Sequence, residues 1–341
     1  MLYSLPIPYL EDATPYFVAV RGGPWAAWLD SGNIGRFDII VAYPVCTLLT
    51  QGEETSIHNE LTARQSGEDP FALIRAELGA QLAQDPDIPF TGGALGYWGY
   101  DLAGGHTHKP QRTKDADRMA QMAIGIYDWA ILIDHQKKAA RLVSHLRYPQ
   151  TKAMLDQLLQ KIEAAALPEQ SQPRFSVREV PISNFSFVEY QQAYEKVQAY
   201  LLEGDCYQVN LAQRFTAKAS GDAFAAYQAL RKLSPAPYSA FMDWPQAQIL
   251  CASPERFLQV RNRIVETKPI KGTRARALNQ EEDARLANDL LRNPKDRAEN
   301  LMIVDLLRND LSKSCEIGSV RTPKLFELES YSNVHHLVST V

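Results

Sequence analysis

Three side chains in the stretch 253–310 have the chemistry of a proton donor, a nucleophile and a metal ligand. Glu255 follows an apolar run in a short polar break, and a carboxylic acid at such a place can pass protons to a substrate. Lys271 lies in a Pro-Ile-Lys-Gly-Thr segment, where a neutral amine held in a cleft can act as a nucleophile. Glu299 lies in a largely aliphatic segment, and a buried carboxylate is costly unless it is paired or binds a metal.

Each of these side chains also has a simpler interpretation. Lys271 can be a solvated lysine in a turn between two strands. Glu299 can form an ion pair with Arg297 or Arg308, which lie nearby in the sequence. The residues alone favour the ion pair and the metal ligand about equally.

The element that must position Glu299 is a helix that begins at the pair Asn293-Pro294. Asn can cap a helix, and Pro suits the first helical position. The helix is apolar nearly all round, which predicts that it is buried. Residues three and four apart share a helix face, so Glu299 shares one with Ile303 and Leu306 and is expected to point inward.

The rest of the chain predicts alternating strands and helices. Pro24–Leu49 reads as strands around the turn 30–33, and the apolar segment 124–133 reads as one buried strand. The segment 167–187 lacks periodicity and is the best candidate for a linker. Helices are expected at 70–82, 152–166, 186–202, 223–232 and 280–291, and further strands at 207–215, 240–244, 263–267, 320–328 and 334–341.

Composition excludes several classes of protein. The chain has 341 residues, of which 45% are hydrophobic and 22% charged, and its net charge is −4. Such a chain forms a real core and gives no sign of binding nucleic acid or an anionic membrane. The four cysteines are widely separated, which indicates reduced thiols in the cytoplasm, and neither a signal peptide nor an apolar run of membrane-spanning length is present in the sequence.

Five motifs resemble those of the chorismate-utilising enzymes. They read GDCYQVNLAQRF at 204–215, SPERF at 253–257, PIKGT at 269–273, DRAENLMIVDLLRND at 296–310 and VHHLVST at 334–340. The resemblance extends from about Pro24 to Val341. The lysine of PIKGT is its most specific residue, because relatives that form anthranilate have alanine there. The chain thus resembles the branch that forms 4-amino-4-deoxychorismate, the precursor of 4-aminobenzoate in folate biosynthesis.

The resemblance implies a fold and a division into regions. The expected fold is α+β, with two large, mostly antiparallel β-sheets packed face to face and helices outside, as in component I of anthranilate synthase, and incomplete at the C-terminus. Residues 1–170 would form an N-terminal region with a candidate tryptophan pocket. Residues 180–341 would form the catalytic region that binds chorismate.

The resemblance also implies an amino transfer to chorismate. Glu299 would be a ligand of Mg²⁺, which prefers oxygen ligands. Lys271 would attack ring carbon C2 while Glu255 protonates the departing C4 hydroxyl, and ammonia would then add at C4 and displace the lysine. Substrate-binding roles are implied for Thr267, Gly272, Thr273 and His336.

Two further ligands follow from the resemblance. Relatives bind L-tryptophan near a segment that Leu29-Asp30-Ser31 resembles, with Pro237, Tyr238 and Ser239 as the other wall. An ordinary hairpin turn explains the same residues equally well. The resemblance implies that ammonia comes from a separate glutamine amidotransferase subunit, and the chain itself has no Cys-His glutaminase signature.

The relatives continue beyond the position of Val341, with a Gly-Ala-Pro-Lys segment and further Mg²⁺-binding glutamates. The expectation is therefore that this chain alone has little synthase activity. Two alternatives stay open. One is another chorismate enzyme, an anthranilate or isochorismate synthase. The other is a non-catalytic fragment that binds tryptophan or the partner subunit.

Overall fold

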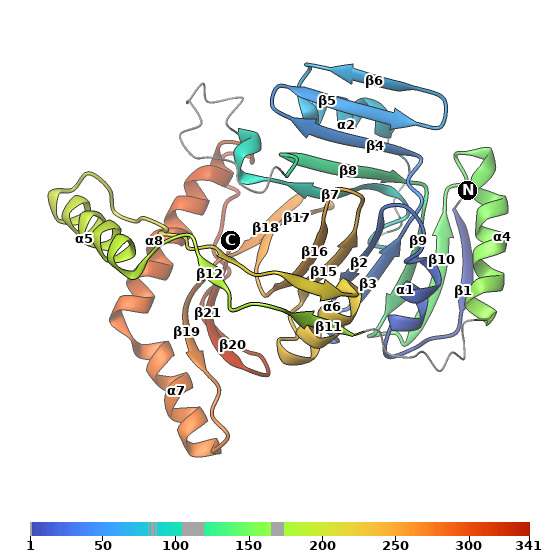
Figure 1. Ribbon diagram of the computed structural model, residues 1–341. Helices are drawn as coiled ribbons and strands as arrows, with labels where there is room; N and C mark the ends of the chain where they lie inside the picture. Colours follow the sequence, from blue (N-terminus) through green and yellow to red (C-terminus); the bar gives the residue numbers. More distant parts are fainter. Residues whose placement is uncertain (1, 81, 83–84, 86, 104–118, 165–173) are drawn as a thin grey trace. The chain divides into compact units, whose positions relative to one another are not determined.

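The structure is a computed structural model that describes residues 2–80, 82, 85, 87–103, 119–164 and 174–341 (Figure 1). It divides into two compact units. The first comprises Met1–Pro168 and Leu230–Val341, and the second comprises Glu169–Ala229. Both regions named in the sequence analysis contribute strands to the first unit, and their standing as separate domains stays a prediction. Within the described residues, no helix combines the length and the apolar character needed to cross a membrane.

The first unit is built on a seven-stranded antiparallel sheet with the order β1-β10-β9-β3-β2-β15-β16 (Figure 1). Strand β15 comes from the second half of the sequence and pairs with all five residues of β2. The two halves of the chain therefore share one sheet. The strands are β1 (Tyr3–Ile7), β2 (Ala26–Asp30), β3 (Phe37–Val41), β9 (Trp129–Asp134), β10 (Ala139–Ser144), β15 (Tyr238–Asp243) and β16 (Gln248–Ser253).

A five-stranded antiparallel sheet with the order β6-β5-β4-β8-β7 lies next to the first. Its strands are β4 (Cys46–Gln51), β5 (Glu54–Asn59), β6 (Ala63–Ser66), β7 (Gly93–Trp98) and β8 (Met122–Tyr127).

The prediction of one buried strand at 124–133 is wrong. The segment forms β8 and β9, which belong to different sheets and are separated by Asp128. The Asp128 carboxylate is buried and accepts a hydrogen bond of 2.7 Å from the Thr151 hydroxyl. Both strands are buried along their whole length, so the apolar run continues through the change of sheet and hides it.

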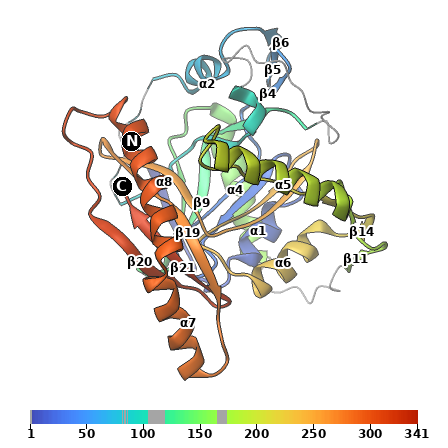
Figure 2. The ribbon, with the colours of Figure 1, turned by 90° about the vertical axis from the view of Figure 1, so that its left-hand side faces the viewer.

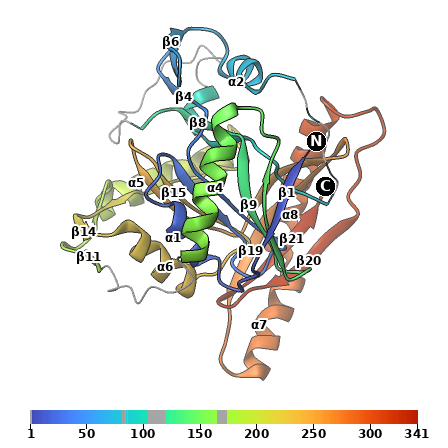
Figure 3. The ribbon, with the colours of Figure 1, turned by 90° about the vertical axis from the view of Figure 1, so that its right-hand side faces the viewer.

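The two sheets pack face to face, as predicted. Their shared core contains Trp25, Val41, Leu132, Val143, Met242 and Trp244 around the seven-stranded sheet, and Leu95, Ala123 and Tyr127 from the five-stranded one. Helices cover the outer faces. Helix α2 (Pro70–Leu78) packs on β4 and β7, while α1 (Thr14–Val20) lies beside α4 (Pro149–Ala164) on the larger sheet (Figure 3).

The C-terminal part of the first unit contains the strand hairpin β17 (Arg256–Arg261) and β18 (Ile264–Lys268), followed by a three-stranded sheet. That sheet has the order β19-β21-β20, with β19 at Ile270–Ala275, β20 at Lys324–Ser330 and β21 at Val334–Thr340. Helices α7 (Gln280–Arg292) and α8 (Pro294–Ser312) pack along it (Figure 2). Lys271 thus lies in a strand, and the prediction of a turn there is wrong.

The second unit contains two short strand pairs and a long helix. Strand β11 (Phe175–Val177) pairs with β14 (Ala219–Gly221), and β12 (Ile182–Ser183) pairs with β13 (Phe215–Thr216). Helix α5 (Phe187–Glu203) begins with a capping box between Ser186 and Glu189 and ends at Gly204. The prediction of a strand at 207–215 is wrong except for its last residue, because β12 offers β13 only two paired positions. Helix α6 (Ala223–Leu233) leads out of this unit.

Candidate active site

The three-stranded sheet has one helix-covered face and one face that carries a row of polar side chains. Strand register pairs His336 with Thr273 on one side and with Glu329 on the other. Directly paired residues point to the same face of a sheet. Thr273, His336 and Glu329 therefore form a row across all three strands.

The opposite face is tied to the two helices by polar contacts. Arg274 binds Asp289 of α7 and Asp296 of α8, each at 2.8 Å. The amide of the fully buried Asn300 accepts a hydrogen bond from the Ser339 hydroxyl and donates one to the carbonyl of Leu337. These contacts hold α8 against β19 and β21.

Gly272 is required by the same packing. Its φ of +89° is rarely adopted by other residues, and an added Cβ would lie 2.9 Å from the Leu290 side chain and 3.0 Å from Asp296. The residues on either side interrupt the ladder, because the register shifts between Ile270 and Thr273. Lys271 therefore lies in a β-bulge that is pressed against the helices.

The bulge brings the predicted acid to the backbone of the residue before the predicted nucleophile. Glu255 lies between β16 and β17, and its carboxylate accepts a hydrogen bond of 3.3 Å from the backbone N–H of Ile270. Ile270 directly precedes Lys271, whose side chain is half-buried. In the part of the chain that the structure describes, no hydrogen bond or ion pair involves the Lys271 amine.

His336 has the environment of a neutral imidazole. Its Nδ1 lies 2.9 Å from the Thr273 hydroxyl. Burial lowers the pKa of His336, and the nearby charges of Glu329 and Glu255 oppose that shift only in part. A neutral imidazole can both donate and accept a hydrogen bond, so it can share a proton with a polar substrate group.

Glu299 lies on α8 as predicted, but the helix is less buried than its sequence suggests. Asn293 caps it and Pro294 opens it, while Leu301 and Leu306 are 51% and 39% exposed. The expectation of a buried helix is wrong for this face, because polar Asn300 takes a place in the buried stripe. Glu299 itself is half-buried beside that stripe.

The Glu299 carboxylate has no ion pair within the described residues. Arg297 lies over the Phe326 ring and donates to the carbonyl of Leu291, and Arg308 pairs with Asp305. The described part of the chain also contains no group of three or more acidic, histidine or cysteine side chains that could hold a metal. Glu299 thus offers one unpaired carboxylate rather than a complete protein cage.

Thr267 occupies a more structural position than the other candidates. It is buried in β18, where its hydroxyl donates a hydrogen bond of 2.6 Å to the carbonyl of Phe257. Its backbone pairs with Val341 in both directions. These contacts join the hairpin to the three-stranded sheet and so support the strand that leads to Lys271.

The four candidate tryptophan residues come together across strands β2 and β15. Ser239 pairs in register with Asp30, which places Pro237 and Tyr238 near the turn that starts at Ser31. Gly32 has a φ of +61°, and an added Cβ would lie 2.8 Å from the carbonyl oxygen of Ala236. The Ser31 hydroxyl is buried and has no hydrogen-bond partner among the described residues.

Two buried carboxylates, those of Asp30 and Asp38, stabilise this turn. Asp30 is fully buried and pairs with Arg231, with Nε 2.7 Å from the carboxylate. Asp38 is also buried, and its carboxylate accepts hydrogen bonds from the backbone N–H of Ser31 and the Trp28 indole. The turn is therefore held by two acids in the core, which argues for a turn of fixed conformation rather than an ordinary flexible hairpin.

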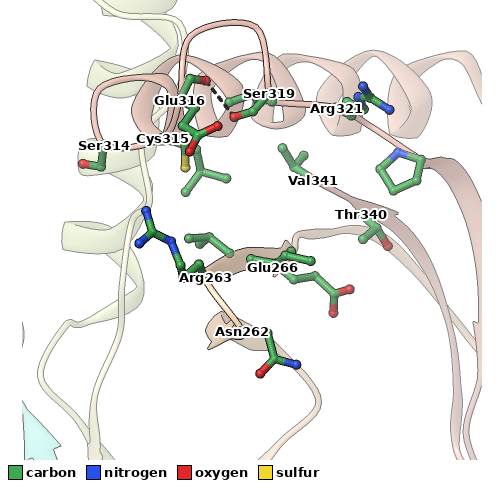
Figure 4. Close-up of a pocket in the computed structure, with 15 residues that line it drawn as sticks. Asn262, Arg263, Glu266, Ser314, Cys315, Glu316, Ser319, Arg321, Thr340 and Val341 are labelled. Carbon is green, nitrogen blue, oxygen red and sulfur yellow. Dashed lines mark hydrogen bonds between the residues drawn. The ribbon is translucent and has the colours of Figure 1, made fainter. Parts of the chain in front are cut away.

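A cavity of about 660 Å³ lies beside the β17–β18 hairpin (Figure 4). Arg263 and Glu266 of the hairpin, the segment after α8 from Ser314 to Pro323, and the last two residues of the chain line it. None of the predicted site residues is among its lining residues in the described chain. The cavity is therefore distinct from the row on the three-stranded sheet.

Sequence reasoning missed several residues of this site. Glu329 joins the row only through the register of β20 against β21, which the sequence does not reveal. Arg231 pairs with an acid 201 positions earlier in the chain. Arg231 lies on an otherwise apolar helix face, and this pattern could have indicated a buried ion pair. The sequence around Glu329 contains no comparable signal.

Comparison with known proteins agrees with this architecture. The family model for chorismate binding enzymes matches residues 26–341. The chain is 44% identical to aminodeoxychorismate synthase component 1 of Klebsiella aerogenes, over 98% of this chain and 74% of the relative. It is 41% identical to the protein of the same name from Escherichia coli (strain K12), over 97% of this chain and 73% of the relative.

A solved structure shows the same fold. The crystal structure of anthranilate synthase component I from Streptococcus pneumoniae TIGR4 superposes with a TM-score of 0.75, at 29% identity, over 90% of this chain and 68% of that one. The expected component I-like fold is therefore confirmed. From the family match and these relatives, we conclude that the chain belongs to the family of chorismate binding enzymes.

Proposed function

We propose that this protein is the synthase subunit that converts chorismate and ammonia to 4-amino-4-deoxychorismate, for 4-aminobenzoate and folate biosynthesis. The observation that carries the proposal is the meeting of Glu255 with the bulge that holds Lys271. An acid beside an amine without an acidic partner suits covalent catalysis. The similarity to relatives named aminodeoxychorismate synthase component 1 supports the same reaction.

The first displacement uses both side chains. The Lys271 amine attacks C2 of the ring, both double bonds of the conjugated diene shift by one position, and the bond between C4 and oxygen breaks. Glu255 gives its proton to the departing oxygen, which leaves as water. A hydroxyl is a poor leaving group, so this proton transfer is where general acid catalysis contributes most.

The second displacement reverses the first at the other carbon. Ammonia attacks C4, both double bonds shift back, and the bond between C2 and the lysine nitrogen breaks. The new ammonium group then returns one proton to the Glu255 carboxylate, which restores the starting state. Two displacements place the amine para to the ring carboxylate, whereas direct attack at C2 would place it ortho.

The neighbouring residues would bind the substrate. His336 and Thr273 share a hydrogen bond at the row and can offer donors and acceptors to the ring carboxylate and hydroxyl. Gly272 lets the backbone approach closely, and Thr267 fixes the strand that leads to it. We assign these four residues to substrate binding and orientation.

Mg²⁺ fits the one unpaired carboxylate of Glu299, because this ion often binds one or two protein carboxylates and completes its shell with water and substrate oxygens. When bound, it would neutralise charge on the ring carboxylate.

We further propose that the protein is cytoplasmic and that L-tryptophan occupies the turn at Ser31 with Pro237, Tyr238 and Ser239. The word "component" in the relatives' names supports a partner subunit, which we propose is a glutamine amidotransferase that delivers ammonia.

The test expresses the protein from its complete coding sequence, whatever its length, and identifies the reaction product. We expect chorismate, ammonium and Mg²⁺ to give the para-substituted amine, identified by chromatography and mass spectrometry. Lys271→Ala should abolish that product, while Lys324→Ala, which removes an exposed lysine of β20, should not. An ortho product from the wild type would instead favour anthranilate synthesis, and para product at an undiminished rate from Lys271→Ala would refute the nucleophile.

A further inference from the structure

The active-site region contains two lysines only three positions apart. Lys268 ends β18 and Lys271 lies in β19, and both side chains are partly exposed. Solvent access therefore does not decide which amine reacts. Their partners differ, because Lys268 forms an ion pair with Glu329, whereas no described residue pairs with the Lys271 amine.

Glu329 is held in place from two directions. One carboxylate oxygen binds the Lys268 ammonium, and the other accepts a hydrogen bond of 2.7 Å from the Tyr331 hydroxyl. Burial opposes ionisation of Glu329, but these two donors outweigh it and lower its pKa. The carboxylate is thus ionised, oriented and fully engaged.

The same carboxylate belongs to the row that Thr273, His336 and Glu329 form across the three-stranded sheet. Glu329 pairs in register with His336, and the Tyr331 ring packs edge-on against the His336 ring at 5.7 Å between centroids. The Lys268 pair is therefore not a remote surface contact. It lies within the row of side chains to which we assign substrate binding.

We propose that Glu329 is a positioning residue that reserves the nucleophilic role for Lys271 by holding Lys268 in an ion pair. The ion pair engages the Lys268 nitrogen with the Glu329 carboxylate and holds that side chain in place. Lys271 lacks such a partner and is the amine that can attack. This inference rests on the proposed function for its meaning, but the difference in reactivity between the two amines does not require chorismate.

The experiment measures that difference directly. The protein is treated with a small amount of the acetyl ester of N-hydroxysulfosuccinimide, and the acetylation rates of Lys268 and Lys271 are followed by peptide mass spectrometry. Fragmentation at Pro269 and Ile270 separates the two sites. In the wild type, we expect Lys271 to react about fivefold faster than Lys268, the upper range for a partly exposed ion pair.

Glu329→Gln keeps the shape of the side chain and removes its charge. It should raise the Lys268 rate about fivefold and leave the Lys271 rate unchanged. The matched control is Glu327→Gln on the same strand, whose partner is the exposed Lys324, and it should change neither rate. Circular dichroism establishes that each variant is folded.

Two results would overturn the proposal. One is equal reactivity of Lys268 and Lys271 in the wild type, a comparison that needs no variant. The other is an unchanged Lys268 rate in folded Glu329→Gln or, if that variant does not fold, in Glu329→Asp, whose shorter side chain withdraws from the ammonium. The acetylation experiment contains no chorismate. Its measured rates for Lys268 and Lys271 therefore remain valid even if the proposed synthase reaction is not observed.

Discussion

The carboxylate of Glu255 accepts a hydrogen bond from the backbone N–H of Ile270, with 3.3 Å between nitrogen and oxygen. This contact spans 15 positions of sequence and fixes an acid at the start of the bulge that contains Lys271. It couples the two groups mechanically. A shift of the bulge would move the nucleophile and release the acid together.

Replacing Glu255 with Gln should therefore reduce turnover with little loss of substrate binding. The amide keeps the hydrogen bond to Ile270 but has no proton to give to the departing C4 hydroxyl. We expect kcat for formation of 4-amino-4-deoxychorismate to fall about 10²–10⁴-fold, the usual contribution of a general acid. KM for chorismate should change little, because the lost interaction is made in the transition state.

Steady-state assays on Glu255→Gln and on the control Glu327→Gln measure this. The control removes an exposed acid whose partner is Lys324 on the same strand. A fall in kcat that is equal in both variants would mean that charge alone, rather than the proton of Glu255, is responsible.

The sequence predicted much of this site because its motifs are local. SPERF spans the junction of β16 and β17, and PIKGT leads into β19, so each motif is a short local segment. The resemblance alone assigned the two motifs to one site. The contact between Glu255 and Ile270 depends on the bulge, and no local sequence pattern predicted that bulge. Glu329 was missed for a related reason, since only strand register brings it beside His336.

The elements that failed in prediction failed through their tertiary surroundings. The strands β8 and β9 are equally buried on both sides of Asp128, so hydrophobicity could not reveal that they enter different sheets. Helix α8 looked buried all round because its residues are mostly aliphatic, yet its buried stripe centres on Asn300 and Val304. Polar Asn300 is there because it bonds Ser339 and the backbone of β21.

Removal of the Glu299 carboxylate should weaken Mg²⁺ binding. Glu299→Gln deletes the charge that we assign to the ion, and a charged contact of this kind is typically worth ~1.5–3 kcal/mol, or roughly tenfold or more in affinity. Calorimetric titration of Mg²⁺ in the presence of chorismate measures it. Asp310→Asn, on the same helix but paired with Lys313 at the surface, is the control and should bind like the wild type. Equal affinities for Glu299→Gln and the wild type would remove Glu299 from the metal site.

Arg231 should be essential for stability. Its guanidinium binds the fully buried Asp30 and lies 4.6 Å from the centroid of the Trp28 ring. Arg231→Met leaves the Asp30 charge without this partner, and breaking a buried pair usually costs ~3–5 kcal/mol. Urea unfolding measures the loss, and Arg285→Met, which breaks an exposed pair within α7, should cost at most ~1 kcal/mol. A loss of the same size in both variants would mean that burial does not control this pair.

His135 should make stability depend on pH. The Asp38 carboxylate, which lies 3.4 Å from Nε2 of His135, raises the pKa of His135 although burial opposes this, so the folded protein binds the proton more tightly than the unfolded chain does. The gain is fully present below the ordinary pKa of ~6.5 and is lost as the pH rises through the folded-state pKa. The free energy of unfolding lost in His135→Gln should therefore be greater at low pH than at high pH.

His145 provides a control of opposite sign. Burial lowers the pKa of His145, so its neutral form is favoured in the folded state and its contribution falls as the pH falls through the ordinary value. Unfolding of His145→Gln should therefore cost the protein less at low pH than at high pH. The same pH dependence in both variants would show that the Asp38 contact does not govern His135.

L-Tryptophan should stabilise the protein through the buried hydroxyl of Ser31. That hydroxyl has no hydrogen-bond partner among the described residues, and a buried polar group without a partner is a place where a ligand gains a hydrogen bond at little cost. A ligand that binds only the folded state raises the melting temperature, so added tryptophan should produce a concentration-dependent shift. Ser31→Ala should weaken binding about three- to tenfold, as expected for one hydrogen bond. Ser56→Ala, in β5 of the other sheet, should leave the affinity unchanged. If tryptophan gave neither heat in calorimetry nor a melting shift at millimolar concentration, the turn at Ser31 would have only a structural role, and the buried hydroxyl would need another explanation.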